Sequence, residues 1–251
     1  MIRRFNRYEL KYLITAAQRD LLLPTIHSHM EPDTEGSPTG QYEVNSLYHD
    51  TWDLACYRAK IDGINYRRKL RIRRYGALES GGNPKVMVEI KQRINRTTQK
   101  RRLALPLDQA YQLCEGQLEP HFENRLDQQT AEEILYLVGA LQLTANCLIS
   151  YRRRAFVGSH YEAGLRITFD ENLRVAPPTH GLSAGAPQFH FLPPDWSVLE
   201  VKSNDVMPLW VSRLFAAHSI KVARFSKYCA GIAQLRGLGP GAHPPLGDSH
   251  G

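Results

Sequence analysis

The sequence of 251 residues contains few cysteines and no long apolar segment. Its four cysteines are far apart, at positions 56, 114, 147 and 229, and they form neither a CxxC pair nor a Cys/His cluster. This spacing argues against a zinc site or a disulfide framework, and it favours a reducing, cytoplasmic location. No run of about 18 apolar residues is present, so we expect no membrane span. The first residues, MIRRFNRYELK, also lack the apolar core of a signal peptide.

Acidic residues are in the minority, and no familiar set of catalytic side chains is present. The chain contains 32 Lys and Arg against 25 Asp and Glu, which gives a net charge of +7. A basic excess indicates a polyanionic partner, which could be nucleic acid, an acidic membrane or a phosphate compound. The histidines show no metal-site spacing, and no Ser/His/Asp or Cys/His arrangement indicates nucleophilic catalysis.

The pattern of polar and apolar residues predicts an antiparallel α+β protein. Alternation predicts strands at 5–14, 42–50, 66–75, 85–93, 99–105, 147–157, 164–175 and 197–203. Apolar spacing predicts helices at 15–30, 107–118, 128–142, 208–218 and 226–236, with Pro24 breaking the first. No repeated strand–helix–strand unit appears, which favours an antiparallel sheet. We expect one domain over 1–236 and a disordered tail over 237–251, where core-forming residues are scarce.

The segment YRRKLRIRRYG shows an unusual charge pattern. On the predicted strand, Lys69, Arg71 and Arg73 lie on one face, whereas Leu70 and Ile72 lie on the other. Mixed faces of bases and carboxylates recur on five further strands, at Glu9 and Lys11, Glu89 and Lys91, Arg153, Arg166 and Asp170, and Glu200 and Lys202. A solvated face is the usual outcome for one such strand, but recurrence over six strands favours a shared function.

Strands of this kind can curl into a barrel in two ways. The apolar faces either fill the interior, or they pack outward against the helices and leave a charged, water-filled lumen. Converging bases repel one another, although Glu9, Glu89, Asp170 and Glu200 would offset part of the charge. A polyphosphate would make the second arrangement favourable, because arginine binds phosphate oxygens bidentately. The carboxylates would suit Mg²⁺ or Mn²⁺ bridged to the phosphates.

Seven segments resemble the VTC domain, and they occur in the same order: RYELKYLI, RRKLRIRRYG, VEIKQR, SYRRRAF, LRITFDENL, LEVKSND and RFSKYCAGI. This is the catalytic domain of the vacuolar transporter chaperone polyphosphate polymerase, one of the triphosphate tunnel metalloenzymes, alongside the CYTH phosphohydrolases. Each motif is weak alone, but the ordered set is specific, and the resemblance covers about residues 3–236. It implies an antiparallel β-barrel that forms a tunnel, with flanking helices and inward-pointing charges.

The resemblance also implies roles for individual residues. Catalytic phosphate contacts would come from Lys11, Arg71, Arg73, Lys91, Arg153 and Arg166. Further phosphate-binding positions would be Tyr151, Ser226, Lys227 and Arg224, the last standing where the family motif has lysine. Glu200 would hold the metal ion, Mn²⁺ or Mg²⁺. The shared charged faces add Lys69 and Lys202 as phosphate-binding candidates, and Glu9 and Glu89 as metal candidates.

The implied activity is transfer of the γ-phosphate of ATP onto a growing inorganic polyphosphate chain, which needs positioning and charge stabilisation rather than a side-chain nucleophile. The hydrolase branch begins with ExExK, but this chain reads Arg7–x–Glu9–x–Lys11. A base replaces the first glutamate, which favours a polymerase over a triphosphatase.

Two other classes of function remain open. The chain could be a triphosphate hydrolase of the same superfamily, or a module that binds polyphosphate or another polyanion without turnover. A nucleic-acid partner is not expected, because the bases share faces and aromatics such as Tyr66 and Phe169 lie opposite them. Product translocation would need a separate membrane-protein partner. The oligomeric state is left open.

Overall fold

The computed structural model describes residues 7–34, 37–77, 81–95, 97–159, 162–183, 188–204 and 206–238. Its strands are β1 (Arg7–Thr15), β2 (Met30–Pro32), β3 (Gln41–Asp50), β4 (Tyr66–Tyr75), β5 (Lys85–Ile94), β6 (Thr97–Pro106), β7 (Thr144–Gly158), β8 (Arg166–Ala176), β9 (Phe189–His190) and β10 (Trp196–Asn204). Its helices are α1 (Ala16–His29), α2 (Ala55–Ile61), α3 (Leu107–Cys114), α4 (Arg125–Leu141), α5 (Leu209–Ala217) and α6 (Lys227–Arg236), with a 3-10 turn at Pro178–His180. The predicted α+β class is confirmed.

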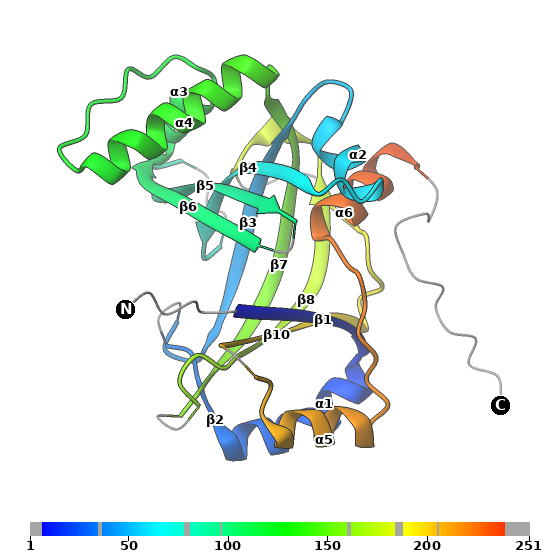
Figure 1. Ribbon diagram of the computed structural model, residues 1–251. Helices are drawn as coiled ribbons and strands as arrows, with labels where there is room; N and C mark the ends of the chain where they lie inside the picture. Colours follow the sequence, from blue (N-terminus) through cyan, green and yellow to red (C-terminus); the bar gives the residue numbers. More distant parts are fainter. Residues whose placement is uncertain are drawn as a thin grey trace.

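One antiparallel sheet forms the body of the structure. Its strands follow the order β1-β10-β8-β7-β3-β4-β5-β6, and the short strands β2 and β9 pair with β7 and β8. The sheet curls into a half-barrel, so that β1 and β10 cross in front of the long strands β7 and β8 (Figure 1). Glu9 on β1 pairs with Lys91 on β5 at 3.6 Å. This contact joins β1, at one end of the sheet, to β5, the strand next to the other end, through side chains.

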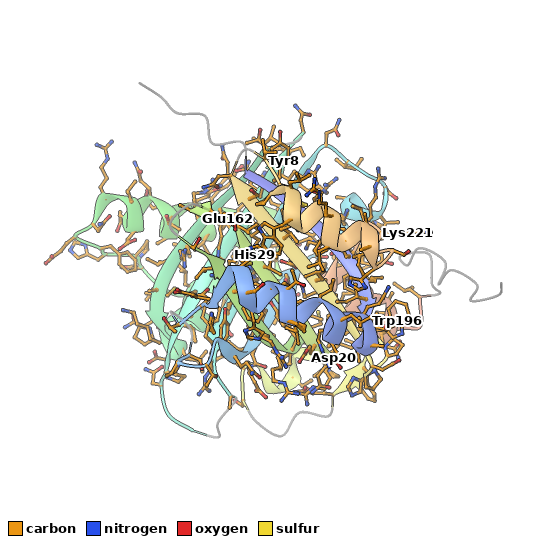
Figure 2. The ribbon with its side chains drawn as sticks, turned by 90° about the horizontal axis from the view of Figure 1, so that it is seen from below. Tyr8, Asp20, His29, Glu162, Trp196 and Lys221 are labelled. Atoms are coloured by element: carbon orange, nitrogen blue, oxygen red, sulfur yellow. The ribbon has the colours of Figure 1, made fainter. Side chains whose placement is uncertain are left out.

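The apolar faces of the strands point outward and are covered by helices. On β4 and β5, Leu70 and Val88 are fully buried in one core with Ile134 of α4. On β10 and β8, the apolar face forms a second core with α1 and α5, which lie side by side across it (Figures 1 and 2). The structure therefore has the second of the two predicted arrangements, in which the charged faces line the inside of the curl. This charged inner side of the half-barrel is called the tunnel below.

Helix α1 differs from its prediction. Thr15 caps it, accepting a hydrogen bond from the backbone N–H of Gln18, whose side chain accepts one from the N–H of Thr15. Pro24 was expected to break this helix, but it lies inside α1, which continues to His29. Leu22 and Ile26, on either side of the proline, are fully buried. Packing of this face outweighs the hydrogen bond that proline removes.

Helix α6 packs on the inner side of the curled sheet, unlike the other helices described above. It shares a core with Val44 of β3 and with Ile149 and Val175 of β7 and β8. Gly231 permits this approach, because a Cβ at this position would collide with Ile149 and press on Val175. The helix begins at Ser226, whose side chain accepts a hydrogen bond from a backbone N–H of its first turn.

A buried carboxylate fixes α6 and α2 relative to the sheet. Asp50, at the end of β3, accepts hydrogen bonds from the backbone N–H groups of Cys56 and Tyr57 in α2, at 2.8 and 3.0 Å. The hydroxyl of Tyr228 in α6 donates to the same carboxylate. The first residue of α6, Lys227, is thereby held at the charged inner face.

Some predictions fall outside the described part of the chain. The predicted disordered tail lies beyond it from residue 239 onward, and so do residues 5 and 6 of the first predicted strand and the side chain of Arg7. Of the helices that are described, none combines the length and the apolar character needed to cross a membrane.

Candidate functional site

Two carboxylates and three bases form a central group on the inner face of the half-barrel. Glu200 of β10 lies 2.7 Å from the ammonium of Lys227 and 3.1 Å from that of Lys11. Asp170 of β8 is bound bidentately by Arg153 of β7, at 2.6 and 2.8 Å, and lies 2.6 Å from Lys227. The Lys227 ammonium thus bridges two carboxylates that come from neighbouring strands.

The charges of this central group stabilise one another. Burial alone would raise the pKa of Glu200, but Lys11, Lys227 and Arg153 hold it well below its ordinary value. Burial would likewise lower the pKa of Lys227, but Asp170 and Glu200 raise it above its ordinary range. All these groups are therefore ionised at neutral pH, and a ligand in the tunnel meets fixed charges.

A second charged group lies on the β4–β5 wall and is built around Glu89. This carboxylate is fully buried, and Arg71 approaches it at 2.8 and 2.6 Å through two nitrogens. Lys100 of β6 lies 2.5 Å away, and Arg73 lies 3.9 Å away. Burial would raise the pKa of Glu89, but Arg71, Arg73 and Lys100 lower it to about 2.

Tyrosine hydroxyls connect the two groups. The Tyr151 hydroxyl accepts weak hydrogen bonds from Arg73, at 3.4 Å, and from Arg153, at 3.5 Å. The Tyr48 hydroxyl accepts from Arg71 at 2.8 Å. Burial would raise the pKa of Tyr48, but Arg71 and Arg73 lower it to about 8. Neutral hydroxyl acceptors therefore help to orient Arg71 and Arg153, which also bind carboxylates, and Arg73.

The other predicted site residues surround these groups at varying depth. Lys202 is 3.9 Å from Glu200, and Lys91 pairs with Glu9. Arg166 pairs with Asp33 and donates to the Tyr42 hydroxyl at 3.1 Å. Lys69 donates to Ser226 at 3.1 Å, at the start of α6. Arg224 is exposed in the segment before α6 and is not part of either charged group.

Bases outnumber carboxylates among the described residues that form or border the two charged groups. Ten bases contribute: Lys11, Lys69, Arg71, Arg73, Lys91, Lys100, Arg153, Arg166, Lys202 and Lys227. Five carboxylates lie among them: Glu9, Asp33, Glu89, Asp170 and Glu200. The excess of positive charge is enclosed by the curled sheet, and such a concave basic surface attracts an anion with several charges.

Comparison with known families identifies the chain. A family model described as the VTC domain matches residues 6–236. The chain belongs to the VTC domain family. The match extends over the strands and helices that enclose the tunnel, from β1 to the end of α6. No curated protein matches the chain.

Two solved structures resemble this VTC domain distantly. One is a Vibrio parahaemolyticus protein described as a candidate adenylate cyclase, with 11% identity, a TM-score of 0.45, and coverage of 90% of this chain and 97% of that chain. The other is the Schizosaccharomyces pombe Mediator head module, with 7% identity, a TM-score of 0.39, and coverage of 85% and 90%. Both similarities are too distant to support an inference about function.

The carboxylates of the VTC domain could hold a divalent cation where β1 meets β10. Glu9 and Glu200 lie 3.2 and 3.1 Å from the same Lys11 ammonium, so two carboxylates converge on one cationic atom. Mg²⁺ commonly binds one or two carboxylates together with substrate phosphates. Glu89 is engaged with Arg71 on another wall. No group of three or more possible metal-ligating side chains occurs among the described residues, so the other ligands would be phosphate oxygens or water.

Sequence reasoning missed several residues of the tunnel as site residues. Asp170 was counted only as a compensating charge, yet it binds both Arg153 and Lys227. Lys100 lies in the predicted strand 99–105 but was not singled out; it is opposite Lys91 in the register, and its ammonium reaches Glu89, a diagonal neighbour, at 2.5 Å. Tyr48 gave no signal, because a tyrosine on a predicted strand is usually a packing residue.

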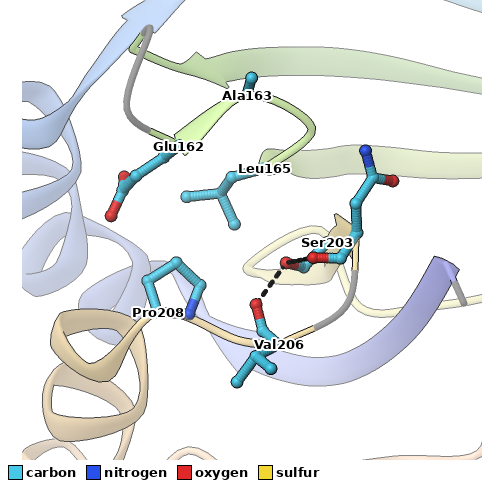
Figure 3. A pocket seen from close by; sticks show the side chains of 7 residues that line it. Glu162, Ala163, Leu165, Ser203, Val206 and Pro208 are labelled. Atoms are coloured by element: carbon cyan, nitrogen blue, oxygen red, sulfur yellow. Dashed lines mark hydrogen bonds between the residues drawn. The ribbon is translucent and has the colours of Figure 1, made fainter. Parts of the chain in front are cut away.

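A separate cavity of about 310 Å³ lies away from the tunnel, between the start of β8 and the segment that follows β10 (Figure 3). Its lining residues are Glu162, Ala163, Leu165, Ser203, Asn204, Val206 and Pro208. The Ser203 hydroxyl donates to the Val206 carbonyl at 2.6 Å. This lining contains a carboxylate and no base, so it is unsuited to a polyanion.

The lowered pKa of Lys202 predicts that anion binding by the VTC domain depends on pH. Burial lowers its pKa to about 8, although Glu200 and Glu9 oppose the shift. A bound polyanion raises this pKa again, so binding above pH 8 requires uptake of a proton. We expect the affinity for tripolyphosphate, measured calorimetrically without metal, to fall with pH by up to about tenfold per unit above pH 8 because of this residue.

The matched control is Lys202→Arg, which keeps the charge at all these pH values. The ligand and Tyr48 titrate in both proteins, so the difference between the two pH profiles isolates Lys202. Parallel profiles from pH 7 to 9 would contradict the assignment.

Proposed function

We propose that this VTC domain is a metal-dependent polyphosphate polymerase that transfers the γ-phosphate of ATP onto a growing inorganic polyphosphate chain. The observation that supports the proposal most strongly is the enclosed excess of ten bases over five carboxylates, with Arg71, Arg73 and Arg153 held in place by fixed partners. Phosphoryl transfer needs little more from the protein than alignment and charge stabilisation.

The side chains have distinct tasks in this proposal. A terminal oxygen of the polyphosphate attacks the γ-phosphorus, the bond to the β–γ bridging oxygen breaks, and ADP leaves. The guanidinium groups of Arg71, Arg73 and Arg153 bind equatorial phosphate oxygens and hold donor and acceptor in line. Lys11 and Lys227 neutralise charge that develops on the leaving group. The acceptor oxygen is already ionised at neutral pH, so no general base is required.

The proposed metal site is formed by Glu200 and Glu9. A divalent cation bound there, Mg²⁺ or Mn²⁺, would polarise phosphate oxygens and neutralise charge during transfer. Lys11 currently lies between the two carboxylates, so its ammonium would have to turn toward a phosphate when the cation binds.

Tripolyphosphate should raise the melting temperature of the purified chain more than monophosphate does at matched ionic strength. The tunnel bases repel one another in the empty protein, and a ligand bound only by the native state stabilises it by mass action. Differential scanning fluorimetry without metal measures this directly. Equal shifts for the two ligands would argue against a tunnel that binds extended phosphates.

An activity assay separates the proposed function from its alternatives. With ATP and Mn²⁺ or Mg²⁺, a polymerase produces ADP and long-chain polyphosphate, which is visible on a polyacrylamide gel. A triphosphate hydrolase releases inorganic phosphate without polymer. A binding-only module shows the thermal shift with tripolyphosphate but no turnover of either kind.

A further inference from the structure

One end of the β4–β5 wall carries bases and no carboxylate of its own, although Lys91 pairs with Glu9 of β1. The register places Arg67 directly opposite Arg93 and Lys69 directly opposite Lys91. Like charges at directly opposite positions destabilise a sheet. Two residues further along, the pattern changes, because Arg71 lies opposite Glu89. This wall thus carries a carboxylate at the second charged group and none at its outer end, where β4 begins and β5 ends.

Helix α2 packs against β4 and adds a further base, Lys60, to this outer end. Burial lowers the pKa of Lys60, and the neighbouring charges of Arg67, Lys69 and Arg93 lower it further. Among the described residues, none of these four bases forms an ion pair with a carboxylate. Four positive charges therefore converge where α2 meets β4 and β5, at an energetic cost that binding of an anion would remove.

The side chains at this end are held in place without being neutralised. Arg67 donates to the carbonyl of Ile64, and Arg93 donates to the carbonyl of Asn95 at 2.8 Å. Lys69 donates to the Ser226 hydroxyl and lies 4.8 Å from the centre of the Tyr228 ring. Each of these three bases keeps further N–H donors for a ligand.

We propose that Lys60, Arg67, Lys69 and Arg93 form an outer binding site for a linear polyphosphate segment, beyond the triphosphate site of the tunnel. The inference rests on the proposed function, because it assigns the second site to the chain that is being extended. Arg67 is four residues from Arg71 on an extended strand, a separation of about 13 Å. A triphosphate bound at Arg71 does not reach Arg67, whereas a longer chain does; Lys69, two residues from Arg71, lies where the two sites meet.

The observations favour polyphosphate over a nucleic acid. Surfaces that bind single-stranded nucleic acid usually carry aromatic rings between their basic side chains, and the nucleobases stack on these rings. Here Tyr66 lies on the opposite face of β4, where Arg68 stacks on its ring at 4.9 Å. The outer site offers charge and hydrogen-bond donors at regular strand spacing, which suits a repeating chain of phosphates.

The test compares long-chain polyphosphate with tripolyphosphate, without metal, by isothermal calorimetry. We expect wild type to bind the long chain more tightly than tripolyphosphate. The double variant Arg67→Ala/Arg93→Ala should bind the long chain about tenfold more weakly, since both bases are partly exposed, and should bind tripolyphosphate as wild type does. Thermal unfolding checks that the variant is folded.

A matched double variant, Arg68→Ala/Arg125→Ala, removes two charges that lie outside the tunnel. Arg68 is on the other face of β4, and Arg125 is exposed at the start of α4. It should bind both ligands as wild type does. An equal loss of long-chain affinity in both doubles, or an equal loss for both ligands in Arg67→Ala/Arg93→Ala, would overturn the outer site.

Three further results distinguish the possible failures. If wild type binds tripolyphosphate tightly but binds the long chain no better, the outer site is wrong and the proposed function stands. If wild type does not bind tripolyphosphate, the proposed function fails, and the outer site fails with it. An RNA oligonucleotide could displace the long chain at equal concentration and bind Arg67→Ala/Arg93→Ala more weakly than wild type. That result would assign these basic residues to nucleic acid instead.

Discussion

Glu200→Gln is expected to abolish nearly all metal-dependent phosphate transfer while metal-free binding of tripolyphosphate persists. The substitution keeps the size of the side chain and removes its charge. Glu200 of β10 and Glu9 of β1 converge on the Lys11 ammonium, and Glu200 is proposed as the principal metal ligand. Metal-free affinity should be equal or higher, because the carboxylate repels a phosphate. Mn²⁺-dependent formation of polyphosphate and calorimetric binding measure the two effects.

The same substitution should also destabilise the empty protein. Glu200 is enclosed by Lys11, Lys227, Arg153 and Lys202. Removing one partner from a buried ion pair typically costs about 3–5 kcal/mol, because the opposite charge is left without compensation. Tripolyphosphate should restore most of the lost melting temperature, since its charge replaces that of the carboxylate.

Glu171→Gln is the matched control for Glu200→Gln. Glu171 is the next residue after Asp170 on β8, is similarly buried, and pairs with Arg19 of α1 on the outer face of the sheet. Its substitution should lower stability without affecting turnover. If Glu200→Gln transfers phosphate at nearly the wild-type rate, Glu200 is only a counter-charge, and the metal-ligand assignment is wrong.

The sequence was informative where the arrangement follows from strand period. Alternation alone separates Arg71 from Leu70, and the recurrence of that pattern indicated a shared charged surface. The family resemblance, rather than the pattern, implied that this surface points inward. Because adjacent strands in a sheet share their inner face, residues distant in sequence, such as Lys11 and Glu200, could be expected on one surface. The inferences from strand period need only local geometry, which the order of residues determines.

Contacts made across the fold could not be predicted in this way. The bridge of Lys227 between Asp170 and Glu200 depends on α6 packing inside the curled sheet, and nothing in the spacing of its residues indicates which face of the sheet a helix covers. Glu89 was a metal candidate because it shares the charged face, but it lies on another wall from Glu200 and pairs with Arg71. Strand period gives the face of a residue, not its depth or its partner.

Arg71→Ala is expected to weaken tripolyphosphate binding by about 1.5–3 kcal/mol, the usual range for a hydrogen bond to a charged group. Arg71 is held toward the tunnel by Glu89 and by the Tyr48 hydroxyl, so its guanidinium is oriented before a ligand arrives. This range corresponds to a loss of affinity of about 10-fold to 150-fold. Calorimetric titration without metal measures it directly.

Arg68→Ala provides the comparison. It removes the same charge from the opposite face of β4, at a position three residues from Arg71. Arg68 lies over the Tyr66 ring and has no role on the inner face. Its substitution should change the affinity little, since a partly exposed charge outside the tunnel is screened by water and salt.

Part of any loss in Arg71→Ala will come from Glu89, which is left facing Lys100 and Arg73 with less compensation. The double substitution Arg71→Ala/Glu89→Gln removes that contribution: if it restores full affinity, Arg71 only neutralises Glu89, whereas a persistent loss assigns Arg71 to the phosphate itself. Equal effects of Arg68→Ala and Arg71→Ala would show that only the net charge of the chain matters, and the inward assignment of this face as a phosphate site would be wrong.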